Sequence, residues 1–327
     1  MPLPLKSGDV LRGRYQIRKI IGQGGSGSIY LADDLRLIGR LCALKEVEHD
    51  RSLTGDLLKE ARDQFLQEAT VLARLDHPNL PKVSDFFSIS GRDYLVMDYV
   101  PGEDLRTLML EAKRNEHFLS EVDVLNWIGQ LSDALIYLHE QEPPILHRDI
   151  KPSNLKLTPS GLLKLVDFGL VKVAVPGEVT ITIVQGQGTA LYTPLEQYGG
   201  DSGHTDVRSD IYAMGSTMYH LLTNTSPADA RTRFLSPKAL IPPRSINPEL
   251  SVRTEKAILW AINLHPDERP DNVPIFRQAL MGNHPTITRP ANKKLTISEI
   301  IRLKPEQIFL WSAIGLIMLS FLLTISK

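Results

Sequence analysis

Short apolar runs dominate the first hundred residues of the chain. Residues 14–22, 28–35, 41–48 and 93–100 are rich in Ile, Val, Leu and Tyr and are separated by Gly and Asp turns, a pattern typical of β-strands. Between the third and fourth runs, residues 59–75 repeat apolar side chains at steps of three and four, which predicts an amphipathic helix. The first part of the chain is therefore expected to be a small β-rich lobe with one helix.

After Gly102 the apolar pattern becomes helical. Residues 120–140, 207–223 and 252–264 carry apolar side chains at helical spacing, and Ser120 is a suitable N-cap for the first of these helices. The expected fold class is therefore α+β, with a β-rich lobe joined to a larger, mainly helical lobe and a cleft between them.

The C-terminal end carries a different signal. Residues 308–325 contain no charged side chain, and a helix of about 18 residues nearly spans a hydrocarbon core of about 30 Å. The alternative is a buried helix, but the apolar residues lie all around the helix rather than on one face. We expect one transmembrane helix, preceded by a proline-containing linker over residues 282–307. The remaining chain divides into the β-rich lobe with its connection, 1–101, and the helical lobe, 102–281.

Composition narrows the possible functions. The 37 basic and 38 acidic residues give a net charge of -1, which argues against a general nucleic-acid-binding surface. The one cysteine, Cys42, lies in an apolar run, so the sequence contains no internal disulfide or cysteine zinc cluster, and core packing is its expected role. Residues 1–6 lack the apolar segment of about 7–15 residues that a secretory signal needs.

A glycine-rich turn lies between two of the predicted strands, in the stretch IGQGGSGSIYLA. A dinucleotide-binding fold would need a helix after such a turn, whereas here a strand follows. Glycines on a hairpin let backbone N–H groups approach phosphate oxygens without a side-chain clash. A plain flexible hairpin is the alternative to a nucleotide-covering turn.

Lys45 lies inside an otherwise apolar predicted strand. A buried lysine is costly unless it is paired, and Glu68 lies on the apolar side of the helix that follows. Two unrelated surface charges are the alternative, but together with the glycine turn the pair favours phosphate binding.

The stretch ILHRDIKPSNLKL, residues 145–157, gathers groups suited to phosphoryl transfer. Asp149 and Asn154, with Asp167 at the end of a later apolar run, offer the oxygen ligands that Mg²⁺ accepts, and Lys151 adds a cation. Taken alone, such a loop is equally typical of a solvated turn.

Taken in order, these motifs resemble those of the eukaryotic-type protein kinase family, and most closely its bacterial Ser/Thr subgroup. The resemblance implies a bilobal kinase fold and transfer of the γ-phosphoryl group of ATP to protein hydroxyls, with Mg²⁺ or alternatively Mn²⁺. The spelling HRDIKPSN, with Lys151 two places after Asp149, is similar to the Ser/Thr subclass. A kinase-like small-molecule phosphotransferase and a pseudokinase scaffold remain as alternatives. All of Lys45, Asp149, Asn154 and Asp167 are present, which disfavours the scaffold.

The resemblance also implies roles for single residues. Asp149 would accept the proton of the substrate hydroxyl, and Lys151 would neutralise the γ-phosphate. Lys45, anchored by Glu68, would contact the other phosphates. Metal binding is implied for Asn154 and Asp167. The implied nucleotide contacts are Gly22, Gln23, Gly24, Gly25, Ser26, Gly27, Ile29, Ala43, Lys45, Met97, Asp98, Val100, Asp104 and Lys156. Structural support is implied for Arg148, Thr189, Glu196, Asp210 and Arg269.

Two positions depart from the family pattern. The chain has Pro194-Leu195-Glu196 where the family commonly has Ala-Pro-Glu, which keeps the carboxylate for Arg269 but moves the proline. Lys156 stands where an apolar residue usually lies under the adenine ring, and its aliphatic stem could still cover the base with the ammonium directed outward.

Regulation and partners are further expectations. Thr180 and Thr182 resemble the activation-segment threonines that bacterial kinases phosphorylate on themselves, although both alternate with apolar residues as in a plain extended segment. The expected partners are proteins with Ser or Thr acceptors, the membrane, and a second copy of the chain for autophosphorylation, but no nucleic acid. The basic residues Lys293, Lys294, Arg302 and Lys304 precede the apolar segment, which predicts a single-pass membrane protein with a cytosolic kinase domain.

Overall fold

The computed structural model describes residues 4–24, 27–47, 55–167, 172–173, 187–198 and 205–282. The chain divides into two units, Met1–His284 and Pro285–Lys327. All described residues belong to the first unit, and the account below concerns that unit alone.

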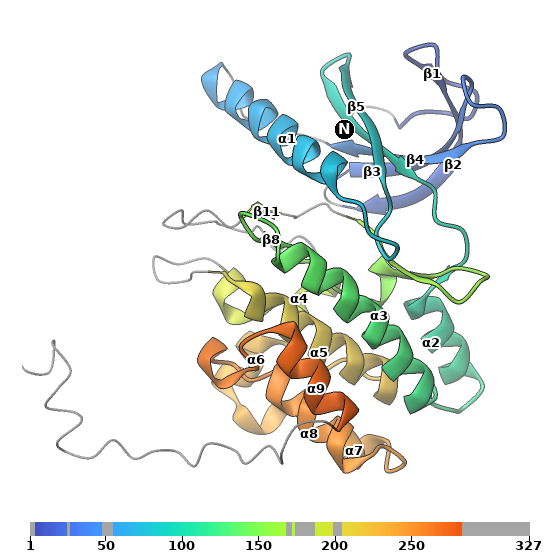
Figure 1. Cartoon of the computed structure of the whole chain (residues 1–327). Coiled ribbons are helices and arrows are strands. Elements are labelled where there is room, and N and C mark those ends of the chain that lie inside the picture. Colours follow the sequence, from blue (N-terminus) through green and yellow to red (C-terminus); the bar gives the residue numbers. More distant parts are fainter. Residues whose placement is uncertain are drawn as a thin grey trace, which may run out of the picture. The chain divides into compact units, whose positions relative to one another are not determined.

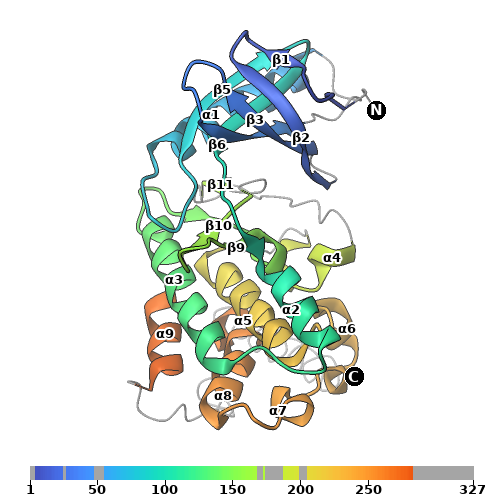
Figure 2. The same ribbon diagram turned by 90° about the vertical axis from the view of Figure 1, so that its right-hand side faces the viewer.

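A six-stranded antiparallel sheet forms the N-terminal lobe, with strand order β1-β2-β3-β4-β6-β5. The strands are β1 (Val10–Leu11), β2 (Tyr15–Gly24), β3 (Gly27–Asp34), β4 (Leu41–Val47), β5 (Val83–Ile89) and β6 (Arg92–Asp98). Helix α1 (Asp56–Arg74) joins β4 to β5 and packs against β5 (Figures 1 and 2). The four predicted strands and the predicted helix are all present. Strand β5 was not predicted, because polar residues interrupt its apolar positions in VSDFFSI.

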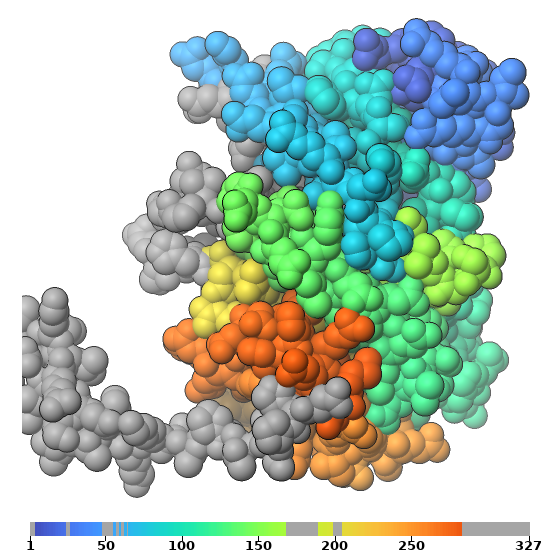
Figure 3. All heavy atoms as spheres, viewed as in Figure 1, coloured from blue at the N-terminus to red at the C-terminus, as the bar shows by residue number. Residues whose placement is uncertain are grey.

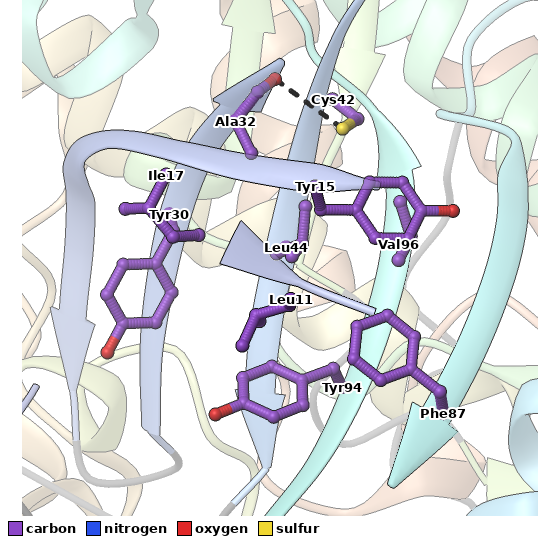
Figure 4. Close-up of a cluster of buried hydrophobic side chains, with 10 residues drawn as sticks. All are labelled: Leu11, Tyr15, Ile17, Tyr30, Ala32, Cys42, Leu44, Phe87, Tyr94 and Val96. Carbon is purple, nitrogen blue, oxygen red and sulfur yellow. Dashed lines mark hydrogen bonds between the residues drawn. The ribbon is translucent and has the colours of Figure 1, made fainter. Parts of the chain in front are cut away.

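Aromatic side chains fill the core of this lobe (Figure 4). The ring of Phe87 stacks on Tyr15 at 5.7 Å and on Tyr94 at 5.3 Å between ring centroids. Cys42 lies in the same cluster with only 1% of its surface exposed, and its thiol is 3.5 Å from the carbonyl oxygen of Ala32. The expected role of Cys42 in core packing is therefore confirmed.

The C-terminal lobe is mainly helical. Its helices are α2 (Leu105–Arg114), α3 (Glu121–His139), α4 (Gln187–Ala190), α5 (Val207–Thr223), α6 (Ala230–Leu235), α7 (Pro243–Ile246), α8 (Val252–Ala261) and α9 (Val273–Met281). Its short strands are β7 (Glu103–Asp104), β8 (Ile145–Leu146), β9 (Leu155–Leu157), β10 (Leu163–Leu165) and β11 (Lys172–Val173). Helix α5 is buried along nearly its whole length and contacts α3, α8 and α9. In the space-filling view of Figure 3, the surfaces of α3 (green) and α9 (orange) lie next to each other.

The three predicted helices of this lobe are present as α3, α5 and α8. Ser120 is the N-cap residue of α3, as expected, but its side chain makes no capping hydrogen bond. The α+β class and the bilobal fold are confirmed. The chain passes from the sheet to the helices between β6 and β7.

Gly102 brings β7 close to β9. Its φ is +99°, and an added Cβ would lie 2.1 Å from the carbonyl oxygen of Leu157, so a side chain is excluded. The close approach places Asp104 of β7 directly opposite Lys156 of β9. Both of these residues line the site described below.

Within the described ranges, no helix is long and apolar enough to cross a membrane. The predicted span at 308–325 lies outside the described residues, as does the predicted linker beyond Gly282.

Candidate active site

A cavity of about 630 Å³ is lined by residues of both lobes. Most of the predicted nucleotide, metal and catalytic residues line it: Gly22, Gln23, Gly27, Ile29, Ala43, Lys45, Met97, Asp98, Val100, Asp104, Asp149, Lys151, Asn154, Lys156, Asp167 and Thr189. Gly24 ends β2 without lining the cavity, and Gly25 and Ser26 lie outside the described residues. Six lining residues were not predicted: Ile21, Pro81, Tyr99, Arg106, Ser153 and Val166. Tyr99 and Val166 adjoin recognised motifs, whereas Pro81 and Arg106 carry no local signal.

The glycine turn lies on the hairpin between β2 and β3, beside β4. Gly27 has a φ of +122°, and an added Cβ would lie only 1.9 Å from the carbonyl oxygen of Glu46. The turn therefore depends on a residue without a side chain at this position. Ile29 pairs with Lys45 across β3 and β4, which places an apolar side chain and a cation side by side at the cavity.

Lys45 is almost fully buried and forms an ion pair with Asp167. Burial opposes ionisation of Asp167, but the charge and hydrogen bond of Lys45 outweigh it, so the pKa of this carboxyl is lowered. The Asp167 backbone has a φ of +69°, a strained conformation that the surrounding contacts must hold.

The ion pair that the structure shows for Lys45 is with Asp167, whereas the sequence analysis expected Glu68. The counterion of the buried ammonium is instead Asp167, which follows β10 of the other lobe. Glu68 lies half-buried on α1. Burial lowers the pKa of the Arg148 guanidinium, and the negative charge of Glu68 partly offsets this effect. The sequence analysis chose Glu68 as the partner of Lys45 because it is nearer in the sequence. In the fold, Asp167 from the other side of the cavity forms the ion pair.

Asp149 is held by two neighbours of its own loop. Its Oδ2 accepts hydrogen bonds from Lys151 Nζ at 2.8 Å and from Asn154 Nδ2 at 3.0 Å. Lys151 Nζ also donates to the hydroxyl of Thr189 at 3.2 Å. The other oxygen of the carboxylate, Oδ1, is buried and has no hydrogen-bond partner among the described residues. One oxygen of Asp149 is therefore held by two neighbours of its own loop, in a residue that lines the cavity.

Asp210 of α5 binds the backbone of the residues that directly precede Asp149. It is fully buried and accepts hydrogen bonds from the backbone N–H groups of His147 at 2.9 Å and Arg148 at 2.8 Å. It is also bonded to the ring of His139 at 2.9 Å. Burial opposes the ionisation of Asp210, but these hydrogen bonds and nearby imidazole rings lower its pKa. The contacts hold Arg148 at a φ of +63° immediately before Asp149.

Glu196 and Arg269 form a bidentate ion pair. Arg269 Nη1 donates to Oε1 of Glu196 at 2.6 Å and Nη2 donates to Oε2 at 3.0 Å. The hydroxyl of Ser209 also donates to Oε1. The unusual Pro194-Leu195-Glu196 order therefore still delivers the carboxylate to Arg269.

Lys156 lies on the cavity wall with its ammonium turned toward Tyr99. Nζ lies 5.7 Å from the centroid of the Tyr99 ring, a cation–π contact. Burial lowers the pKa of Lys156, and the charge of Asp104, opposite it on β7, acts in the other direction. The aliphatic stem is thus available to the cavity while the charge lies at its edge.

Asn154 and Asp167 fit the requirements of a Mg²⁺ site. The amide nitrogen of Asn154 donates to the carbonyl oxygen and to Oδ2 of Asp149, which orients its own carbonyl oxygen away from that residue. The lowered pKa of Asp167 keeps its carboxylate ionised at neutral pH. In the described part of the chain, no group of three or more His, Cys, Asp or Glu residues could hold a metal ion. Two oxygen ligands fit Mg²⁺, which usually takes its remaining ligands from water and substrate phosphates.

Comparison with known proteins agrees with the fold and the site. Residues 15–270 match the model of the protein kinase domain. A probable serine/threonine-protein kinase of Clostridium acetobutylicum is 33% identical over 271 residues, which cover 81% of this chain and 39% of that protein. The tyrosine-protein kinase MasK of Myxococcus xanthus is 31% identical over 281 residues, which cover 82% of this chain and 42% of MasK. The chain thus spans about two fifths of the length of these relatives.

Solved structures give the same result. The PknI kinase domain of Mycobacterium tuberculosis superposes with a TM-score of 0.63 at 28% identity, covering 86% of this chain and all of that domain. This chain belongs to the protein kinase family, and its relatives include bacterial Ser/Thr kinases.

Proposed function

We propose that this chain transfers the γ-phosphoryl group of ATP to serine and threonine hydroxyls of proteins. The observation that carries the proposal is the hydrogen bonding of the Asp149 carboxylate at the cavity wall. Its Oδ2 is held by Lys151 and Asn154, while its buried Oδ1 has no hydrogen-bond partner in the part of the chain that the structure describes. In this proposal the Asp149 carboxylate, which lines the cavity, accepts the proton of the substrate hydroxyl during transfer.

The neighbouring residues suit the other parts of phosphoryl transfer, which depends mainly on positioning and charge stabilisation. The Lys45 ammonium supplies a cation for nucleotide phosphates, and Lys151 supplies one beside the acceptor hydroxyl. Asn154 and Asp167 would hold Mg²⁺, which would neutralise the charge that develops on the phosphates. The glycine-rich hairpin around Gly27 would let backbone N–H groups approach these phosphates without a side-chain clash.

The choice of acceptor rests on Lys151. Its ammonium donates hydrogen bonds to Asp149 and to Thr189. The HRDIKPSN stretch that contains Lys151 is similar to that of Ser/Thr kinases, which supports Ser/Thr specificity. One relative is named as a tyrosine-protein kinase, so the acceptor type must be tested directly.

The test uses the full-length protein with ATP and Mg²⁺. It is incubated separately with a mixture of unfolded proteins and with a mixture of small hydroxyl-bearing metabolites. Phosphate on protein serine and threonine supports the proposal. Phosphate on a metabolite alone would instead identify a small-molecule phosphotransferase, and absence of transfer to either mixture would identify a scaffold.

We further propose that the protein is anchored in a membrane through residues 308–325, with the kinase domain in the cytosol. Support comes from the uncharged sequence of this segment and the basic residues that precede it. Fractionation of cells tests this proposal. The full-length chain should require detergent for extraction, and a chain cut after Pro305 should not. A full-length chain found in the soluble fraction without detergent would contradict the anchor.

We also propose that phosphorylation of Thr180 and Thr182 activates the enzyme, with a second copy of the chain as one source of the phosphate. These threonines lie outside the described residues. Support comes from Arg148, which is buried and whose Nε and Nη1 have no hydrogen-bond partner within the described ranges, as suits a site for an added phosphate. Mass spectrometry of the active protein tests this idea. Absence of phosphate at both threonines, or unchanged activity of the Thr180→Ala, Thr182→Ala variant, would contradict it.

A further inference from the structure

Eight charged residues line the cavity, and seven of them have a neighbour of opposite charge. Lys45 pairs with Asp167, Lys151 with Asp149, and Asp98 with Arg40, while Asp104 lies opposite Lys156 in the ladder of β7 and β9. The remaining residue is Arg106, which has no hydrogen bond or ion pair with any residue in the described ranges. An unpaired guanidinium at a cavity wall is suited to an anionic group supplied by a ligand.

Arg106 lines the same cavity as Asp149 and Lys151. It is the second residue of α2 and is exposed to solvent. Burial raises the pKa of Tyr192, and the charge of Arg106 opposes that shift, which places the two side chains near each other. The Tyr192 backbone N–H donates to the carbonyl oxygen of Thr189 at 3.0 Å, and the Thr189 hydroxyl accepts from Lys151. Arg106 therefore lies near Tyr192, and hydrogen bonds connect Tyr192 through Thr189 to Lys151 beside Asp149.

The surroundings of Arg106 add further positive charge. Lys113 lies two helical turns farther along α2, and the charges of both cations act on His220 of α5. Lys113 donates to the carbonyl oxygen of Asn224, so it is held in place beside α5. Arg106 differs from Lys113 because it lines the cavity and has no such bond.

We propose that Arg106 is a specificity-determining residue that selects protein substrates with an acidic side chain close to the acceptor hydroxyl. The guanidinium can bind an aspartate or glutamate carboxylate of the substrate through two parallel hydrogen bonds. This inference rests on the proposed protein kinase function. The inference specifies which amino-acid sequences around the acceptor hydroxyl the enzyme prefers.

The experiment compares synthetic peptides that contain one acceptor serine and one variable position, moved stepwise along either side of it. At each position the peptide carries Asp, its neutral analogue Asn, or Lys. The full-length protein should phosphorylate the best Asp peptide with a kcat/KM roughly tenfold above that of its Asn partner. The effect should fall mainly on the KM for peptide, with the KM for ATP unchanged. Arg106→Ala should abolish the difference, and Arg106→Glu should favour the Lys peptide instead.

Arg114→Glu is the matched control, because Arg114 is an exposed cation of the same helix that does not line the cavity. This variant should keep the parent's preference. Equal rates for Asp and Asn peptides at every position would overturn the inference while leaving protein kinase activity established. The inference would also fail if Arg106→Glu kept the acidic preference, or if Arg106→Ala raised the KM for ATP alone. Failure of the parent to phosphorylate any peptide or protein would overturn the proposed function itself.

Discussion

The ammonium of Lys45 and the carboxylate of Asp167 form an ion pair across the cavity, between β4 of one lobe and the segment after β10 of the other. Lys45 is thereby the counterion of a proposed metal ligand as well as a cation for phosphates. The Lys45–Asp167 pair connects the two lobes through the site itself.

Lys45→Met should reduce phosphoryl transfer by at least about 100-fold, because it removes a cation from the phosphate site and leaves the partly buried Asp167 carboxylate without its ion-pair partner. The initial rate of phosphate incorporation into protein measures this effect. Lys19→Met is the control, since Lys19 is an exposed lysine of strand β2 in the same sheet and should keep the parent rate. Equal losses in both variants would indicate general damage to the sheet.

Gly215→Ala should destabilise the fold, because the added Cβ would lie 2.7 Å from Cβ of Ala261 and force α5 and α8 apart. Overpacking of this kind typically costs about 1–3 kcal/mol of unfolding free energy, measured by urea denaturation. Gly129→Ala in α3 is the matched control, because its nearest neighbour, Met281 Cε, is 3.8 Å away. That variant should be neutral or slightly stabilising. A Gly215→Ala protein as stable as Gly129→Ala would refute the close helix contact.

Glu196→Gln should lower the unfolding free energy by about 3–5 kcal/mol, because the Arg269 guanidinium is fully buried and loses its charged partner. Asp133→Asn is the comparison, since it breaks the Asp133–Arg277 pair, in which both side chains are exposed. That change should cost less than about 1 kcal/mol. Similar costs for the two variants would show that the Glu196–Arg269 pair contributes little to the fold.

The hydroxyl of Tyr192 and Nδ1 of His220 lie 2.6 Å apart in a hydrogen bond, and the environment of this imidazole predicts a pH dependence of stability. Burial, with the charges of Lys113 and Arg106, lowers the pKa of His220 from 6.5 to about 4. Between these values the unfolded chain binds more protons than the folded one, so acid favours unfolding. The stabilisation from the neutral ring is full above about pH 6.5 and is lost as pH falls toward 4, by an amount on the order of 3 kcal/mol.

Urea midpoints at about pH 7 and about pH 5 measure this loss. Because the pKa values of His77 and His147 are also lowered by burial, the parent should lose stability through several histidines in the same range. His220→Asn removes one of them and should reduce the difference between the two pH values. An unchanged difference in this variant would refute the contribution of His220.

Local sequence patterns were enough to predict several of the strands and helices and the loop around Asp149. The strands around Lys45 and the loop from Arg148 to Asn154 follow from apolar alternation and from groups a few positions apart. The ion-pair partner of Lys45 could not be predicted this way, since it depends on where α1 and the segment after β10 lie in space.

The position of Arg106 at the cavity also escaped prediction. It is an ordinary helical arginine in the sequence, and only the packing of α2 beside Tyr192 and His220 brings it to the site. The same holds for β5, whose register against β6 depends on partners distant in the chain rather than on its own apolar pattern.

The most direct test of the account replaces one oxygen of the proposed base. In Asp149→Asn, the amide keeps the size of the side chain but cannot take the proton of the acceptor hydroxyl, so transfer to protein should fall by about 100- to 10,000-fold. ATP binding, measured by the shift in melting temperature with nucleotide and Mg²⁺, should stay close to that of the parent, because Asp149 acts on the acceptor. The decisive measurement is phosphate incorporation into protein serine and threonine by parent and variant at equal concentration. Loss of transfer with retained ATP binding is the predicted result, and an Asp149→Asn protein that phosphorylates serine or threonine at the parent rate would contradict the account.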